Sequence, residues 1–377
     1  MKICHITHGR VNPDGENGIT RTVYNLNKYL NENGVESKIL SFNDNTKSVE
    51  EFKRDEYTNI LLFPRSKFYK NKQFEAFILS DEFDYDVVHF HLMWMIDKNT
   101  ILKALKKKNI PYIITTHAAY TPDRIDSFKK KIAMKSIEFN YLKGAKSLHA
   151  LCNEEKVFLK ELNLNCPIFT IPNGISDIEV EKINYAKKLD NPYVPNDINI
   201  VWVGRIRKDK NIMGILKSLL LIDSTTRNKI KIHIVGNGIE AYIKEVNAFV
   251  DTNDLSNIVK FHGPKFKEEK YQYILNANIY LQPSFSEGIS FSILDAMACS
   301  KASILSRQTN MTYYYNERFF LMTEPYPEDI ANAIIKLTND LDLQQEMSIN
   351  ARRLIDQDLN WKNLINAYID MYEKVKN

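Results

Sequence analysis

Apolar and polar residues alternate along this chain in a pattern that predicts buried strands separated by amphipathic helices. The first apolar run, KICHIT, precedes a loop of turn-forming residues and a helix at 19–34 with apolar residues along one face. Further apolar runs, NILLF, DVVHFH, PYIITT, SLHAL and PIFTIP, follow with helical segments between them. Continuous apolar strands that alternate with helices are typical of a parallel sheet covered on both faces.

The pattern stops after residue 175 and starts again at residue 197. Residues 176–196 are polar and contain two prolines, which is typical of a linker. The strands INIVWVG, IKIHIVG, IVKFHG, IYLQP and ASILS then alternate with helices, and the chain ends in helices. We therefore predict an α/β protein with two doubly wound domains, at 1–175 and 197–355, and a final helix within 356–377.

Composition excludes several classes of protein. The 377 residues exceed one ordinary core, and a net charge of +4 without an aromatic-basic motif argues against a nucleic-acid binder. The four cysteines are scattered and show neither a metal-ligand spacing nor a disulfide framework, which favours a cytoplasmic protein. The sequence lacks a signal-peptide pattern and a run of about 20 apolar residues, so any membrane contact is expected to be peripheral.

Positive charge is concentrated between residues 98 and 146, a segment that contains twelve Lys or Arg residues and only three acidic residues. A helix in this segment carries an apolar stripe of Phe128, Ile132, Ile137 and Tyr141. Such a helix could lie on anionic lipid or could face the core with its lysines in solvent. The helix by itself slightly favours the second interpretation.

Candidate ligand-binding residues follow two strands of the second half. In VWVGRIRKDKN, the strand ends at Gly204, which permits close approach of a ligand, and Arg205 and Lys210 follow. A fork donor and a point charge suit a diphosphate, although a charge-rich solvated loop would have the same composition. In HIVGNG, Gly236 and Gly238 indicate either a loop of ligand-binding amides or only a turn.

A third segment, SEGISFSILDAMA, places two carboxylates around an apolar helix. Gly288 and Ile289 offer backbone amides at the helix start, and Ser290 is a plausible cap. Glu287 and Asp295 would lie about 12 Å apart along the axis. That is too far for the paired acids of glycoside hydrolysis, which are roughly 5–9.5 Å apart, but it suits a long ligand such as a sugar nucleotide.

Three histidines follow strands of the first half. His117 comes directly after PYIITT, at the carboxyl end of a strand, where a binding role and a structural role are equally expected. His89 and His91 in VVHFH should point to the same side because side chains alternate along a strand. They could bind a metal, but no acidic third ligand is evident, so we expect no metal there.

These motifs together resemble a known family. Gly18 in the first glycine loop is followed by TTHA, IPNGI, VGRIRKDKN, IVGNGIE and SEGISFSILDAMA, in the order seen in the family 4 glycosyltransferases with the GT-B fold. The resemblance covers nearly the whole chain. It implies two Rossmann-like domains facing each other across a cleft, and a final helix that crosses back onto the first domain.

The resemblance also implies an activity. The implied activity is transfer of a sugar from a UDP- or GDP-linked donor, with retention of configuration and without a metal or another cofactor. The acceptor is expected to be a glycan or lipid-linked glycan of bacterial-type surface polysaccharide biosynthesis. Peripheral contact of residues 98–146 with the anionic inner face of the membrane is a further hypothesis.

The family pattern gives each matching residue a role. Arg205 and Lys210 hold the diphosphate and stabilise the leaving phosphate, Glu287 hydrogen-bonds the donor sugar, and His117 contacts the transferred sugar. Asp295 takes the place of a ribose-binding glutamate, and the segment FHGPK lies near the base. The remaining matched positions are expected along the donor: Gly18, Gly204, Gly236, Gly263, Gly288, Ile289 and Ser290.

The chain departs from the family pattern at three positions. Asp295 is one methylene shorter than the usual glutamate, Ala118 stands where glycine is common, and Ser176 where aspartate is common. The first departure puts the ribose contact in question. Two alternatives stay open: a sugar-nucleotide epimerase on the same two-domain plan, and a non-catalytic GT-B module that only binds a partner.

Overall fold

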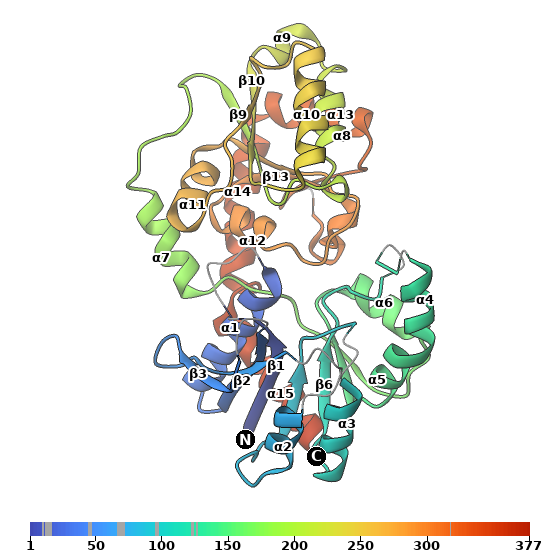
Figure 1. The fold of residues 1–377 in the computed structure, drawn as a ribbon. Helices are drawn as coiled ribbons and strands as arrows, with labels where there is room; N and C mark the ends of the chain where they lie inside the picture. Colours follow the sequence, from blue (N-terminus) through green and yellow to red (C-terminus); the bar gives the residue numbers. More distant parts are fainter. Residues whose placement is uncertain are drawn as a thin grey trace. The chain divides into compact units, whose positions relative to one another are not determined.

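The computed structural model divides the chain into two compact units (Figure 1). The first unit is Met1–Asn173 together with Trp361–Asn377, and the second is Gly174–Asn360. The structure describes residues 1–9, 11, 17–43, 47–65, 72–94, 98–121, 124–125, 127–316 and 318–377. Within these ranges, no helix combines the length and the apolar character needed to cross a membrane.

The first unit is built on an eight-stranded sheet with the order β3-β4-β2-β1-β5-β6-β7-β8. All neighbouring strands are parallel except β3 and β4. The strands are β1 (Lys2–His8), β2 (Glu36–Asn43), β3 (Glu50–Lys53), β4 (Asn59–Pro64), β5 (Val87–Phe90), β6 (Tyr112–Thr115), β7 (Ser147–Ala150) and β8 (Ile168–Thr170). Strands β2, β4 and β3 lie on one side of β1, and the later strands β5 to β8 lie on its other side, so the direction in which strands are added reverses between β1 and β5.

Helices cover both faces of this sheet because alternate strand residues point to opposite sides. Ile3 lies in the core under α1 (Gly18–Glu32) and α15 (Trp361–Lys376), whereas its neighbour Cys4 lies in the core of the other face. The remaining helical elements are α2 (Lys72–Leu79), α3 (Lys98–Lys107), α4 (Phe128–Ala133), a π-helical turn (Met134–Glu138), α5 (Phe139–Lys143) and α6 (Asn153–Glu161).

The basic segment divides at the π-helical turn. Tyr141 is fully buried in the core, whereas Phe128 and Ile132 of α4 are 77% and 54% exposed. The interpretation of a core-facing helix is therefore correct for the end of the stripe and wrong for its beginning. The turn itself is held by the buried carboxylate of Glu138, which pairs with Lys98 and accepts a hydrogen bond from Tyr120.

The second unit is a six-stranded, fully parallel sheet with the order β11-β10-β9-β12-β13-β14. This is the Rossmann order, in which the chain runs outward on one side of the first strand and then on the other. The strands are β9 (Ile198–Val203), β10 (Ile230–Val235), β11 (Val259–Phe261), β12 (Ile279–Gln282), β13 (Ala302–Ser306) and β14 (Leu321–Thr323).

Right-handed crossovers place the helices on opposite faces when the direction of winding reverses. Helices α8, α10 and α13 pack on the face of Ile200 and Trp202, while α11 packs against β9 and α12 and α14 pack against β13. The helices are α7 (Asp177–Ala186), α8 (Ile212–Leu219), α9 (Ser224–Arg227), α10 (Glu240–Thr252), α11 (Lys267–Asn276), α12 (Phe291–Ala298), α13 (Pro327–Asn339) and α14 (Leu341–Gln357).

The predicted linker at 176–196 contains an ordered helix, so that prediction is wrong for its first half. In α7, the carboxylate of Glu179 accepts a hydrogen bond from the backbone N–H of Ser176 at 2.8 Å. This capping box starts the helix, and burial of Ile183 and Ala186 holds it beside α11. The prolines at 192 and 195 follow the helix and do not interrupt it.

The last helix, α15, begins at Trp361, and residues up to Asn360 belong to the second unit. The predicted C-terminal segment began at residue 356, within α14. Trp361 is fully buried and stacks on Tyr29 of α1 and on Tyr368, with ring centroids 6.2 and 5.7 Å apart. The first unit therefore includes residues from both ends of the chain.

We expect Trp361→Ala to lower the free energy of unfolding of the first unit by about 3–5 kcal/mol, because a large buried ring is lost. The exposed Asn366 on the same helix is the control, and Asn366→Ala should change stability by less than about 0.5 kcal/mol. Urea unfolding of the full chain measures both. Equal effects of the two substitutions would show that α15 does not contribute to the core as the structure describes.

Candidate functional site

The second unit carries its polar cluster at the switch point of the sheet. Strands β9 and β12 are neighbours, and the connections that follow them run in opposite directions. In open α/β sheets, ligands bind at the carboxyl ends of the strands at such a switch point. The loop after β9 and the loop after β12 are joined by a hydrogen bond from the Phe285 backbone N–H to the Asp209 carbonyl at 2.8 Å. The two candidate motifs are therefore parts of one site.

Lys210 and Glu287 form an ion pair within this site. Lys210 Nζ lies 2.6 Å from Glu287 Oε2, and the two side chains are 13% and 9% exposed. The other carboxylate oxygen, Oε1, accepts hydrogen bonds from Gln282 Nε2 at 2.6 Å and Ser284 Oγ at 3.0 Å. The carboxylate is consequently held in one orientation at the end of β12.

The loop that carries Arg205 and Lys210 is anchored by Asn211, which the sequence did not single out. Asn211 adopts the left-handed conformation with φ 59° and is buried. Its amide donates to the carbonyls of Pro283 and Pro325 at 2.9 and 2.8 Å. Arg205 is exposed, and among the described residues nothing pairs with its guanidinium.

The glycines after β9 and β10 are required for close backbone packing. A Cβ atom on Gly236 would lie 1.8 Å from the Gly204 carbonyl oxygen, and one on Gly238 would lie 1.9 Å from the Ile206 carbonyl oxygen. Gly263 after β11 has a φ of +67°, a conformation that favours glycine. These glycines therefore shape the loop that presents Arg205.

Helix α12 begins directly after the Glu287 loop. Ser290 is its N-cap residue, but the Ser290 hydroxyl bonds to Gln282 and Ser292 and does not cap the first turn, which corrects the expectation for this side chain. Gly288 is half-buried and Ile289 is buried. A helix start without a side-chain cap keeps its partial positive charge available to an anion.

Asp295 lies inside α12 and is almost fully buried. Its carboxylate pairs with Lys270 Nζ at 2.7 Å and accepts a hydrogen bond from the Tyr271 hydroxyl at 3.0 Å. Both partners come from α11, and neither was identified from the sequence. The structure therefore separates two carboxylates with different partners, Glu287 with Lys210 and Asp295 with Lys270.

In the first unit, Gly18 is the exposed first residue of α1. The Asn17 side chain caps the helix by accepting a hydrogen bond from the Ile19 N–H at 3.0 Å. Thr22 Oγ1 donates to the Asn173 side-chain oxygen at 2.9 Å, so the IPNG segment is joined to the same helix.

His117 follows β6 in a strained turn. His117 and Ala118 have φ values of +47° and +58°, in the left-handed region that favours glycine. The buried carboxylate of Glu155 holds both sides of this turn by accepting hydrogen bonds from Thr116 Oγ1 and the Ala118 N–H, while its other oxygen accepts from the Leu151 N–H at 2.7 Å. Glu155 thus holds an alanine in a conformation that glycine adopts more easily.

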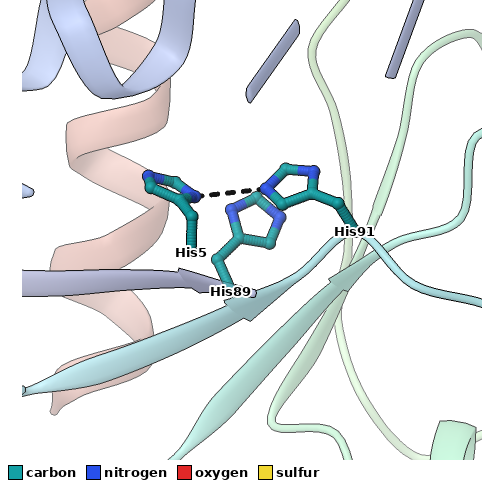
Figure 2. A group of neighbouring side chains, drawn as sticks. All are labelled: His5, His89 and His91. Atoms are coloured by element: carbon teal, nitrogen blue, oxygen red, sulfur yellow. Dashed lines mark hydrogen bonds between the residues drawn. The ribbon is translucent and has the colours of Figure 1, made fainter. Parts of the chain in front are cut away.

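A cluster of histidines, His5, His89 and His91, adjoins this turn through a contact between His91 and His117. Figure 2 shows the three residues of the cluster. His5 of β1 is directly opposite His89 of β5, and the rings of His89 and His91 are on the same side, as predicted, with centroids 4.2 Å apart. His5 Nδ1 is 3.1 Å from His91 Nε2, and His91 Nδ1 is 3.3 Å from His117 Nε2. The contribution of His5 was missed because one histidine in an apolar strand carries no signal.

His5, His89 and His91 could in principle hold a metal, since one nitrogen of each lies within 4.8 Å of the others. Both nitrogens of His89 already have hydroxyl partners, Tyr372 and Thr115, each at 2.6 Å. A metal would have to displace one of these hydroxyls. The hydrogen bonds of the cluster therefore favour uncharged rings bonded to one another.

Burial lowers the pKa of each histidine in this cluster. The pKa falls to about 3 for His5 and for the adjoining His117, and it falls well below the usual value for His89 and His91. The neighbouring His149 of β7, whose Nδ1 is 2.7 Å from Thr115 Oγ1, has a pKa that burial lowers to about 4. The unfolded chain has ordinary values near 6.5, so it binds protons on acidification that the folded chain does not bind.

We therefore expect the first unit to lose stability as the pH falls below about 6.5, before most carboxylates titrate. From about one pH unit above that value, the histidines of the cluster contribute little pH dependence because they are neutral in both states. Denaturant unfolding between about pH 7.5 and 5 should show the uptake of more than one proton on unfolding. A stability that is constant over this range would contradict the burial of the cluster.

Comparisons with known proteins agree with the fold. The family model described as glycosyl transferases group 1 matches residues 187–354, and the model of glycosyltransferase family 4 matches residues 16–177. An uncharacterized glycosyltransferase of Methanocaldococcus jannaschii is 26% identical over 330 residues, which are 84% of this chain and 82% of that protein.

Two further similarities extend over nearly the full length. The O-antigen chain mannosyltransferase C of Escherichia coli is 22% identical and covers 99% of this chain and 98% of its own. The crystal structure of Anabaena HepE in complex with UDP and glucose has a TM-score of 0.79 at 15% identity over 99% of both chains. With two Rossmann-like parallel sheets and matches to both family models, the chain belongs to the family 4 glycosyltransferases of the GT-B fold.

Proposed function

We propose that this glycosyltransferase moves a sugar, with retention of configuration, from a nucleotide-diphosphate donor to a glycan or lipid-linked glycan. The observation that carries the proposal is the Lys210–Glu287 pair at the switch point of the second unit, with Arg205 in the same loop as Lys210. The HepE structure contains UDP and glucose, and the E. coli relative is named as an O-antigen mannosyltransferase. The first supports a nucleotide-sugar donor, and the second supports a role in surface polysaccharide synthesis.

Positive charge at this site fits a diphosphate leaving group. Lys210 has three N–H groups, of which Glu287 occupies one, and the Asp209 carboxylate at 3.7 Å lies beyond hydrogen-bond distance, so donors remain for phosphate oxygens. Arg205 adds an exposed fork donor, and the start of α12 adds a partial positive charge. Negative charge that develops on the diphosphate as the anomeric bond breaks would be stabilised by these groups.

Glu287 is proposed to bind a hydroxyl of the donor sugar, with the amides of Gly288 and Ile289 next to the phosphates. Gln282 and Ser284 fix its carboxylate, which is acceptor-only when ionised. In a retaining reaction of this kind, the acceptor hydroxyl attacks from the side of the leaving group, and its proton passes to the departing phosphate. That route needs neither an enzymic base nor a metal ion.

The other matched residues are proposed to bind the rest of the donor. His117 would contact the transferred sugar, Gly18 the diphosphate, and Gly263 the region of the base. A ribose hydroxyl at Asp295 would have to share the carboxylate with Lys270, whose ammonium lies 2.7 Å from it. Lys270 is therefore proposed as a second contact at the ribose end of the donor.

We expect Lys210→Met to lower the rate of sugar transfer by about 10²–10³-fold, because one stabilising donor on the leaving group is lost. Lys208→Met is the matched control, since Lys208 lies in the same short helical turn with its side chain 77% exposed. Release of nucleotide from a panel of UDP- and GDP-sugars, with and without acceptor, measures the activity.

The assay is repeated in excess EDTA, and unchanged turnover is the expected result. If Lys210→Met matches the control in turnover, the assignment of the site is wrong. A loss of activity in EDTA that Mn²⁺ restores would contradict the metal-independent mechanism. Release of nucleotide with inversion at a sugar hydroxyl, instead of transfer, would favour an epimerase.

We also propose that α4 contacts an anionic membrane surface, where a lipid-linked acceptor would be held. Phe128 and Ile132 are exposed on this helix, and Lys129 and Lys131 beside them are exposed as well. Apolar side chains can enter the interface between headgroups and acyl chains while lysines contact anionic headgroups. The pairing of these residues supports a membrane over an uncharged partner.

Co-sedimentation with vesicles tests this contact. We expect binding to phosphatidylcholine vesicles that contain phosphatidylglycerol, little binding to phosphatidylcholine alone, and clear loss of binding in Phe128→Ser/Ile132→Ser. Val157→Ser, at an exposed apolar residue of α6, is the control and should bind as the wild type does. Binding that is independent of lipid charge, or unaffected by the α4 substitutions, would contradict the proposal.

A further inference from the structure

The hydrogen bonds between His5, His91 and His117 allow only two arrangements of protons. All three rings are uncharged near neutral pH, because burial lowers their pKa values. A neutral imidazole carries one N–H and one acceptor nitrogen. His91 uses both nitrogens, one toward His5 and one toward His117, so it donates to one neighbour and accepts from the other.

The two arrangements differ in the direction of donation. Either His5 donates to His91 and His91 donates to His117, or both bonds run the opposite way. In each case the tautomer of His5 determines that of His117. The tautomers of the three residues are therefore coupled, although His5 lies in β1, His91 follows β5 and His117 follows β6.

His5 decides between these arrangements. Its second nitrogen, Nε2, is buried and has no hydrogen-bond partner among the residues that the structure describes. If the bonds ran from His117 toward His5, the only N–H of His5 would sit on this nitrogen, and a buried donor would be left unpaired. Orphaned buried N–H groups are rare in proteins, because a buried donor without a partner has lost its hydrogen bond to water and gained nothing in return. Placing the proton on His5 Nδ1 leaves only an acceptor unpaired.

We propose that His5, acting through His91, fixes the tautomer of His117 with the proton on Nδ1, so that His117 offers an N–H donor to the transferred sugar. His117 Nε2 accepts from His91, and the residue is half-buried, so Nδ1 is the nitrogen left for a ligand. The contact with the sugar rests on the proposed function, whereas the tautomer does not. His5 and His91 are positioning residues in this arrangement.

A donor at this position selects the partner group on the sugar. A neutral histidine with Nδ1–H binds an oxygen lone pair, which a hydroxyl, carbonyl or carboxylate oxygen supplies. It cannot accept a proton from a hydroxyl through that nitrogen. His117 is therefore expected to orient the sugar as a hydrogen-bond donor without acting as a base.

Nuclear magnetic resonance of the full chain labelled with ¹⁵N-histidine tests the tautomer directly. Protonated and unprotonated ring nitrogens have distinct shifts, and the signals lost in His117→Asn identify those of His117. The expected result is a protonated Nδ1 and an unprotonated Nε2 in the wild type. A protonated Nε2 on His117 would overturn the proposal, whether or not the protein transfers sugar.

Two substitutions at His5 test the coupling. In His5→Asn the amide nitrogen takes the place of Nδ1 and can still donate to His91, so the tautomer of His117 and the transfer rate should be retained. In His5→Leu the donor is absent, and His117 should become a mixture of tautomers, with kcat/KM lower by up to about tenfold. An unchanged tautomer in a folded His5→Leu protein would overturn the coupling.

The experiment also separates this proposal from metal binding. Metal analysis of the purified protein, together with the spectra, would reveal an ion on His5, His89 and His91, and ring nitrogens bound to a metal would overturn the hydrogen-bonded arrangement. Absence of sugar transfer with the expected tautomer would count against the proposed function alone. Retained transfer together with the wrong tautomer would count against the histidine proposal alone.

Discussion

The ion pair between Lys210 and Glu287 joins the two loops that leave the switch point of the second sheet. Both side chains are largely buried, and the Asp209 carboxylate, 3.7 Å from Lys210 Nζ, is too distant to replace Glu287 as a hydrogen-bond partner, so loss of either member would leave a poorly compensated buried charge. The pair therefore depends on the elements that hold each loop in place. Asn211 anchors the loop of Lys210 to the chain beyond β12, and Gln282 and Ser284 hold Glu287. A cation thus stands beside a carboxylate where a diphosphate and a sugar are proposed to meet.

Backbone packing gives this site its shape. Gly236 and Gly238 lie against the carbonyls of Gly204 and Ile206, where any side chain would collide. The first unit solves a similar problem in another way, since it holds the turn at His117 with the buried carboxylate of Glu155. In the second unit, glycines allow the backbone around the loop of Lys210 to pack closely. In the first unit, a buried carboxylate holds the turn that carries His117.

Much of the fold followed from the sequence because continuous apolar strands and the helices between them are local patterns. The motifs also placed Lys210 in the loop after a strand and Glu287 just before a helix, where the structure has them. The helix at 177–186 was missed because its polar composition outweighed the Ser176–Glu179 capping box. Lys270 and His5 were missed because their partners are distant in sequence, and only the folded chain brings them to Asp295 and His91. Sequence periodicity describes faces of elements, but contacts between elements depend on packing.

Equilibrium binding of nucleotides tests the central claim, that the switch-point site recognises a diphosphate. Titration calorimetry with UDP, GDP and the corresponding monophosphates compares ligands that differ by one phosphate. We expect that at least one diphosphate binds and that its monophosphate binds at least about tenfold more weakly, a difference of about 1.4 kcal/mol. Equal affinity for mono- and diphosphates, or no binding of any diphosphate, would contradict it.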